Sequence, residues 1–213
     1  MKLSEMFDWC VNATYQVSGL DVDHLLAPDG NTLYVLFKGS DSESDWKQNF
    51  KFCDEPFCDG KIIGHRGFIE AWRSIIDELH DNVQNILDTN ENINSIVCIG
   101  YSHGAALCCL VTMQLSKQFG ERCDVKGYGF GCPRVIKGSV PKAFKEDFAK
   151  FTIVNNRMDI VPHLPPLLFG FRHTSKPIHV GKWFDHNPID AHRYVNFLPA
   201  IQEYEGTTLP KHN

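Results

Sequence analysis

The sequence predicts an α/β fold with a mostly parallel central sheet flanked by helices. Strand-like and helix-like apolar patterns alternate along the chain, and the run from residue 95 to 101 (SIVCIGY) is strand-like and mostly apolar. A strand covered on both faces has such a continuous apolar run, as in parallel sheets between layers of helices. The 213 residues contain no repeat, low-complexity tract or linker-like block, so we expect one compact domain spanning residues 1–213.

The first half of the chain predicts two strands and two helices. Residues 32–38 (TLYVLFK) are β-branched and aromatic between turn residues, which is typical of a strand. From Phe68 to Leu87 apolar residues recur at steps of three and four, which predicts an amphipathic helix of about five turns. The strand at 95–101 follows, and then a helix from about 104 to 119.

The second half continues the alternation. We expect a strand at 125–130, a helix at 142–148 and a strand at 151–154, followed by a short strand near 178–180. Residues 191–204 predict a last helix, interrupted at Pro199 because proline has no N–H to donate. The pattern does not give the order of the elements at the two ends of the chain.

Composition excludes several classes of function. Twenty-one Lys and Arg oppose 26 Asp and Glu, and no basic run stands out, so nucleic acid is not an expected partner. No stretch approaches the ~18 apolar residues of a membrane-spanning helix. The first ten residues are charged and lack the apolar core of a signal peptide, which favours the cytoplasm, or secretion if a leader has been removed. No partner protein is expected.

Eight cysteines are spread along the chain. Four of them lie in apolar patterns, where a free cysteine acts as a small buried hydrophobe: Cys98, Cys108, Cys109 and Cys132. Cys53 and Cys58 flank a short loop and form the one pair to watch for a disulfide, although reduced thiols are expected without a secretion signal. These two cysteines with His65 lack the fourth ligand of a zinc site, so we expect no metal and no cofactor.

The motif Gly100-Tyr101-Ser102-His103-Gly104 lies between the predicted strand 95–101 and the following helix. In G-x-S-x-G the tight turn forces the serine into a strained conformation that exposes its hydroxyl above the sheet. The alternative is an incidental serine in a glycine-rich turn, because bare matches are common. The strand–turn–helix context favours a nucleophile.

A serine nucleophile needs a base that a carboxylate orients, in the chain order Ser, Asp, His for this type of turn. Asp159 directly follows a predicted strand, so it faces the sheet edge where ligands bind. The rival acids are Asp147, Asp185 and Asp190, of which Asp147 lies in a charged helix. Six histidines follow Asp159, and periodicity does not choose His192 over His186.

Seven segments stand out in order along the chain: Phe37–Ser40, Asp45-Trp46 with Asn49, Gly64–Phe68, Gly100–Leu107, Tyr128–Val135, Asn155–Pro166, and Asp190–His192 with Tyr194. Together they resemble one known family, the class 3 lipases of the α/β-hydrolase fold, which include fungal triacylglycerol lipases, feruloyl esterases and some phospholipases A1. The family more often has Leu at the place of His103 and Gly at the place of Ala105. The chain also looks shorter at its N-terminus than the fungal enzymes.

The resemblance implies Ser102 as nucleophile, Asp159 as orienting acid and His192 as base. It also implies an oxyanion hole formed by the backbone N–H groups of Ser40 and His103, helped by the Ser40 hydroxyl. The implied function is a serine carboxylic-ester hydrolase that works through an acyl-enzyme on acylglycerols or other lipid esters. A non-lipid, feruloyl-type esterase and a catalytically silent binding protein are the alternatives.

The stretch from Asp41 to Lys61 resembles the lid region of the family. Trp46 and Phe50 are one helical turn apart beside the oxyanion residue, so we expect them to line the substrate mouth. Six acidic and three basic residues surround them, which leaves little apolar surface to exchange from protein to lipid. We therefore expect a short lid-like segment, only transient lipid-surface contact and weak interfacial activation.

Overall fold

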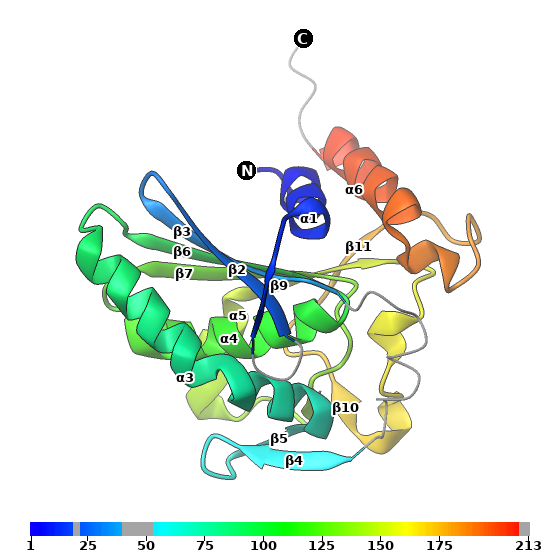
Figure 1. Ribbon diagram of the computed structural model, residues 1–213. Helices are drawn as coiled ribbons and strands as arrows, with labels where there is room; N and C mark the ends of the chain where they lie inside the picture. Colours follow the sequence, from blue (N-terminus) through cyan, green and yellow to red (C-terminus); the bar gives the residue numbers. More distant parts are fainter. Residues whose placement is uncertain (19–21, 40–52, 209–213) are drawn as a thin grey trace.

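The computed structural model describes residues 1–18, 22–39 and 53–208 (Figure 1). Within these residues the centre of the molecule is a seven-stranded sheet. Its spatial order is β1 (Gln16–Ser18), β2 (Val22–Asp29), β3 (Thr32–Phe37), β6 (Ser95–Tyr101), β7 (Asp124–Phe130), β9 (Phe151–Asn156) and β11 (Ile178–Val180). The strands from β3 to β11 are parallel, while β1 and β2 pair antiparallel at one edge. The predicted α/β class with a mostly parallel sheet is confirmed.

Helices cover both faces of this sheet (Figure 1). On one face lie α1 (Leu3–Asn12) and α6 (Tyr194–Thr208), and on the other α3 (Arg66–Thr89), α4 (His103–Phe119) and α5 (Lys145–Ala149). The described residues also form four single-turn 3₁₀ helices: η1 (Lys142–Phe144), η2 (Val161–His163), η3 (Leu167–Phe169) and η4 (Asp190–His192). Among the described residues, no helix combines the length and the apolar character needed to cross a bilayer.

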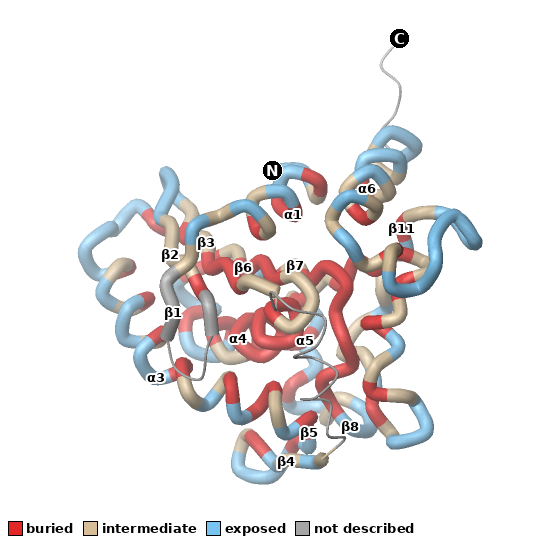
Figure 2. Tube along the Cα trace, turned by 45° about the vertical axis from the view of Figure 1, so that its right-hand side comes forward, coloured by how far each residue is buried: buried red, intermediate tan, exposed pale blue. Residues whose placement is uncertain are grey.

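Alternation along the strands divides the core into two clusters. In β3, Leu33, Val35 and Phe37 pack toward α3 and α4, whereas Leu36 packs toward α1 and α6. This is the two-residue period of a strand between two layers. The helix α4 is buried along nearly its whole length, and Figure 2 shows it as a mostly red tube near the centre of the molecule. In α3, buried and exposed residues alternate. The core therefore sits directly behind the predicted nucleophile turn.

The strands and helices predicted from residue 32 onward are all present, with ends shifted by a few residues. One detail is wrong: α6 continues through Pro199. The proline leaves the carbonyl of Val195 without its helical donor. Val195 is 67% exposed, so water can hydrogen-bond that carbonyl and the helix continues.

The N-terminal segment contains elements that the pattern did not reveal. Helix α1 buries Met6, Phe7 and Cys10 against the sheet. Strand β2 forms a hairpin with β3 across the Asp29-Gly30-Asn31 turn, where Gly30 has a φ of 57°. A positive φ at the turn suits glycine.

A second, four-stranded antiparallel sheet has the order β10 (Phe171–Arg172), β8 (Ile136–Lys137), β5 (Ile62–His65) and β4 (Asp54–Phe57). The lid-like stretch expected from Asp41 to Lys61 is therefore too long at its C-terminal end, since residues 54–57 are a paired strand. Residues 41–52 of that stretch lie outside the described residues.

All eight cysteines are free, Cys53 and Cys58 included. The four expected in the core are buried: Cys98, Cys108, Cys109 and Cys132. Burial raises the pKa of Cys98 and of Cys109 to about 12, so both thiols stay protonated. They act as apolar core residues and not as nucleophiles.

Candidate active site

Ser102 lies in the turn between β6 and α4 with φ 56° and ψ −122°. Such a backbone conformation is strained for a residue with a side chain, and it projects the hydroxyl away from the sheet. Two backbone hydrogen bonds hold the turn: the Ser102 N–H donates to the Phe130 carbonyl at 2.9 Å, and the Ala105 N–H donates to the Ser102 carbonyl at 3.0 Å. The predicted nucleophile turn is therefore present at the end of a buried parallel strand.

The two glycines of the motif allow the close approach of the helix to the sheet. A Cβ on Gly100 would lie 2.3 Å from the Gly104 carbonyl oxygen, and one on Gly104 would lie 2.3 Å from the Lys38 carbonyl oxygen. Both distances are far inside van der Waals contact with rigid backbone. The sequence G-x-S-x-G thus serves packing as well as the exposure of the serine.

Three side chains that are far apart in sequence form one hydrogen-bonded chain. The Ser102 Oγ lies 2.8 Å from His192 Nε2, and His192 Nδ1 lies 2.6 Å from Asp159 Oδ2. Because an ionised carboxylate only accepts, the proton of the neutral imidazole is on Nδ1, which leaves Nε2 to accept from the serine hydroxyl. This is the arrangement of a nucleophile, a base and an orienting acid.

Asp159 is fully buried in the loop that follows β9. Its second oxygen, Oδ1, accepts a hydrogen bond of 2.8 Å from the Val161 N–H. A buried carboxylate is costly unless hydrogen bonds replace its lost water. With one oxygen bound to His192 and the other to the backbone, the carboxylate is held in a single orientation.

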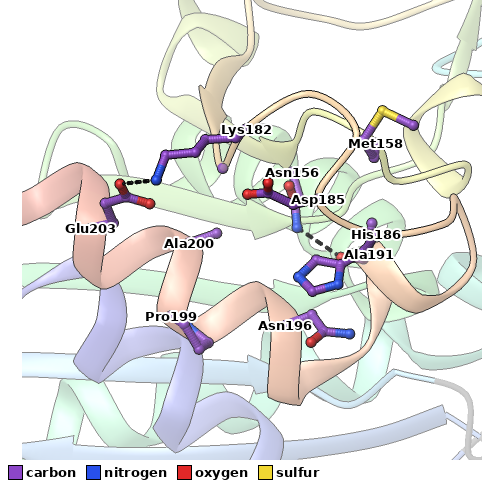
Figure 3. Close-up of a pocket in the computed structure, with 11 residues that line it drawn as sticks. Asn156, Met158, Lys182, Asp185, His186, Ala191, Asn196, Pro199, Ala200 and Glu203 are labelled. Atoms are coloured by element: carbon purple, nitrogen blue, oxygen red, sulfur yellow. Dashed lines mark hydrogen bonds and ion pairs between the residues drawn. The ribbon is translucent and has the colours of Figure 1, made fainter.

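The rival acids and the rival base do not join this chain. Asp147 accepts a hydrogen bond from Ser116 at 2.9 Å, and Asp190 forms an ion pair with Arg193 at 3.4 Å. Asp185 and His186 are exposed, and they line a separate cavity of about 110 Å³ beside α6 (Figure 3). Lys182 and Glu203, which also line this cavity, form an ion pair at 2.6 Å. That volume is well below the roughly 300 Å³ at which ligand pockets begin.

The backbone N–H of His103 lies at the first position of α4, where a helix N–H has no intrahelical acceptor. It is therefore available beside Ser102, as the oxyanion expectation requires. Gly39 also approaches Ser102: a Cβ on Gly39 would lie 3.4 Å from the Ser102 Cβ. The other predicted residues of this region, Ser40, Trp46 and Phe50, lie outside the described residues.

The imidazole of His103 packs against the ring of Phe68 at 5.4 Å between ring centres. Burial lowers the pKa of His103 to about 4, with a smaller contribution from the nearby His65. The ring is therefore neutral at neutral pH, and it adds no charge beside Ser102.

His65 is buried and packs against the rings of Phe68 and Phe171, at 4.6 Å and 5.9 Å. Its backbone N–H donates to the Val135 carbonyl, so the residue ties β5 to the loop after β7.

Within the described ranges no group of three or more His, Cys, Asp or Glu side chains is placed to hold a metal ion. The expectation of no metal and no cofactor stays a prediction.

Two residues at the site were not singled out from the sequence. Gly131 has a φ of 58°, and a Cβ there would lie 2.7 Å from His192 Cε1 and 2.9 Å from Asp159 Oδ2. Tyr101 stacks on His192 and hydrogen-bonds to its backbone. A glycine at the end of a predicted strand and an aromatic residue inside the serine motif were the only available signals.

Replacing Gly131 by Ala is expected to push the His192 ring off its hydrogen bonds, since the added methyl group would overlap both His192 and Asp159. A displacement of about 1 Å at such a site costs on the order of 10²-fold in rate. The measurement is the rate at which a phosphonate reagent labels Ser102, with Gly138→Ala as the control. Gly138 also has a positive φ, but a Cβ there meets nothing within 4 Å. Equal labelling rates for both variants would contradict the assigned crowding.

Comparison with known proteins identifies one family. The family model described as "Lipase (class 3)" matches residues 34–169. A secreted mono- and diacylglycerol lipase of Fusarium solani is 30% identical over 74% of this chain and 45% of its own length. A lipase of Rhizomucor miehei is 28% identical over 68% of this chain and 40% of its own length. The chain therefore spans less than half the length of these curated relatives.

Solved structures agree on the fold. The triacylglyceride lipase of Rhizomucor miehei superposes with a TM-score of 0.68 at 24% identity, over 80% of this chain and 66% of that one. Lipase II from Rhizopus niveus gives 0.67 at 24% identity, over 79% of this chain and 66% of that one. With the serine turn, the parallel sheet and the matched family model, the conclusion is direct: this chain is a member of the class 3 lipase family and has an α/β-hydrolase fold.

Proposed function

We propose that this chain is a serine carboxylic-ester hydrolase that acts through an acyl-enzyme on acylglycerols or related lipid esters. The observation that carries the proposal is the continuous hydrogen-bonded chain from Ser102 through His192 to Asp159. Membership of the class 3 lipase family and the lipase names of the relatives support it.

The geometry accounts for both halves of the reaction. Ser102 Oγ attacks the ester carbonyl carbon while His192 Nε2 takes its proton, and Asp159 stabilises the imidazolium that forms. The imidazolium then donates that proton to the leaving alcohol as the C–O bond breaks, which leaves an acyl group on Ser102. Water, deprotonated by the same imidazole, attacks the acyl group and releases the carboxylic acid.

The negative charge that develops on the carbonyl oxygen needs donors that are already in place. The backbone N–H of His103 is the described candidate, and Ser40 is the proposed second one. The N-terminus of α4 adds a favourable dipole, because the helix begins directly after the nucleophile. The Ser102 N–H does not contribute, since it donates to the Phe130 carbonyl.

The direct test of the function is a series of p-nitrophenyl esters from acetyl to palmitoyl, with the feruloyl ester added. We expect hydrolysis with an optimum at short to medium acyl chains, and only a small rise in rate across the solubility limit of tributyrin. An optimum at aromatic, feruloyl-type esters would favour the non-lipid esterase, and no hydrolysis at any chain length would favour the silent binding protein. A sharp rise at the emulsion point would contradict the expected weak activation.

Ser102→Ala and His192→Ala are expected to lose similar amounts of kcat, by several orders of magnitude, because the two residues act as one unit. His186→Ala is the matched control: an exposed histidine six residues earlier that contacts a separate cavity. Its kcat should stay within about twofold of the wild type, the scale of an ordinary surface substitution. Loss of activity in His186→Ala with retention in His192→Ala would overturn the assignment of the base.

Large apolar side chains are exposed in two connections that follow parallel strands of the sheet. Leu168 in η3 is 90% exposed and Phe184, between β11 and η4, is 87% exposed, with Trp183 beside it at 59%. Figure 1 shows η3 (gold) and the segment before η4 (orange) on the side where β6 and β7 end. Exposed apolar tips around a site are typical of contact with lipid or protein. We propose that these three exposed apolar side chains supply the transient lipid-surface contact.

Leu168→Asp combined with Phe184→Asp is therefore expected to slow hydrolysis of emulsified tributyrin by about tenfold or more, since each buried apolar side chain contributes about 1.5–3 kcal/mol. Hydrolysis of dissolved p-nitrophenyl acetate should not change. Asn85→Asp is the control, because it adds a charge to an exposed position of α3. Equal losses of rate on the dissolved and the emulsified esters would show that these two side chains affect the site itself and not the adsorption of the protein to lipid.

The relatives from Fusarium solani and Malassezia restricta are named as secreted lipases. This favours an extracellular location for this chain over the cytoplasmic one expected from its N-terminal residues. Its free cysteines are the feature more typical of a reducing compartment.

A further inference from the structure

We propose that Tyr101, the residue directly before the nucleophile, is a positioning residue that fixes the plane of the His192 imidazole. It would act through His192 and not on the substrate. The inference rests on the proposed function, because it assigns His192 the role of the base. Its basis is a set of contacts separate from the hydrogen-bonded chain itself.

Tyr101 contacts His192 in two ways. The two rings are stacked, with 4.9 Å between their centres and 20° between their planes. The tyrosine hydroxyl donates a hydrogen bond to the backbone carbonyl of His192. One side chain therefore holds both the ring face and the backbone of the same residue.

His192 needs this external support because of where it lies. It ends the three-residue helix η4, in a connection whose residues 182–189 are all exposed. Such connections carry little packing of their own. The hydrogen bond to Asp159 anchors Nδ1, but it does not by itself fix the tilt of the ring about the axis of that bond. A ring stacked on one face restricts the tilt, and Nε2 then stays aimed at the serine hydroxyl.

Tyr101 is itself firmly placed. It is the last residue of β6 and pairs in register with Phe130 of β7. On its other side Phe7 of α1 makes an edge-to-face contact, at 5.2 Å and 78°, while Phe197 of α6 lies 6.4 Å away. A Cβ on Gly39 would lie 3.0 Å from the Tyr101 ring, so only glycine fits there without moving it. The tyrosine is thus clamped between the strand end and two helices.

The N-terminal helix takes part through these aromatic contacts. Phe7 is fully buried and also packs against Phe197 at 5.0 Å. Polar contacts also join α1 to α6. Among them, the Ser4 hydroxyl donates to Glu205 at 2.6 Å, and the Tyr194 hydroxyl donates to Asp8. Helix α1, which has no catalytic residue, therefore braces Tyr101 and through it the base.

The hydroxyl of Tyr101 remains a donor throughout the working pH range. Burial raises the pKa of Tyr101 well above its ordinary value of 10, and the nearby charge of Asp159 adds to the effect. A phenolate could not donate to the His192 carbonyl, so the raised pKa keeps this contact intact in alkaline solution.

The experiment compares Tyr101→Phe, which keeps the ring, with Tyr101→Leu, which removes it. Tyr128→Phe is the matched control, a half-buried tyrosine of the neighbouring strand that packs on the same core cluster. We expect kcat to fall about three- to tenfold in Tyr101→Phe, the range for one hydrogen bond. In Tyr101→Leu it should fall on the order of 10²-fold, with KM within about twofold. Tyr128→Phe should keep the wild-type kcat.

Two further readouts do not depend on the substrate. The rate at which a phosphonate reagent labels Ser102 should fall in parallel with kcat. The NMR signal of the His192 Nδ1–H, hydrogen-bonded to Asp159, should broaden in Tyr101→Leu and persist in Tyr101→Phe. If the wild type hydrolyses no ester, the proposed function fails, while labelling and the NMR signal still report on the placement of His192.

A purely structural role would give a different pattern. Tyr101→Leu would then lower Tm but keep the wild-type kcat, labelling rate and Nδ1–H signal at temperatures well below that Tm. Equal kcat for the wild type, Tyr101→Phe and Tyr101→Leu would likewise overturn the proposal. Graded losses in which the phenylalanine variant recovers most of the activity would support it.

Discussion

The structure depends on one backbone constraint, the strained turn at Ser102. A residue held at positive φ costs on the order of 1–3 kcal/mol, so the surroundings must hold it in place. Here the turn lies between a strand paired on both sides and a helix buried along nearly its whole length. Gly100 and Gly104 let α4 come so close to the sheet that no other residue fits at either position. The large core behind the turn stabilises a conformation that is unfavourable on its own.

The parallel sheet then brings the three residues of the site together. Ser102 follows β6, Asp159 follows β9 and His192 comes after β11, and these strands all run in the same direction. Their C-terminal ends meet at one edge, so three residues spread over 91 positions of sequence come within hydrogen-bond reach. Side chains outside this hydrogen-bonded chain add further contacts near it. Asn156, for example, donates to the carbonyl of Ala191 at 2.9 Å.

The sequence was sufficient for the parts that depend on local pattern. Apolar periodicity located the parallel strands and α3 and α4, and chain order at a serine turn pointed to Asp159. It did not choose among six histidines, because periodicity carries no information on which loop folds back over the site; the family resemblance supplied His192. Gly131 and Tyr101 were not singled out because their roles are contacts with residues far along the chain. The short α1 was missed since its apolar face has meaning only against the sheet.

The pairing of α1 with α6 has a consequence for how the protein is made. Phe7 packs against Phe197, and Ser4 contacts Glu205 across 201 positions of sequence. At ribosomal speeds of about 5–20 residues per second, the first helix waits on the order of ten to forty seconds for its partner. During that interval Leu36, Ile99 and Phe130 on this face of the sheet are not covered by α6. They form an exposed apolar surface that chaperones or neighbouring chains can bind. His192 immediately precedes α6, so it leaves the ribosome at about the time that this cover becomes available.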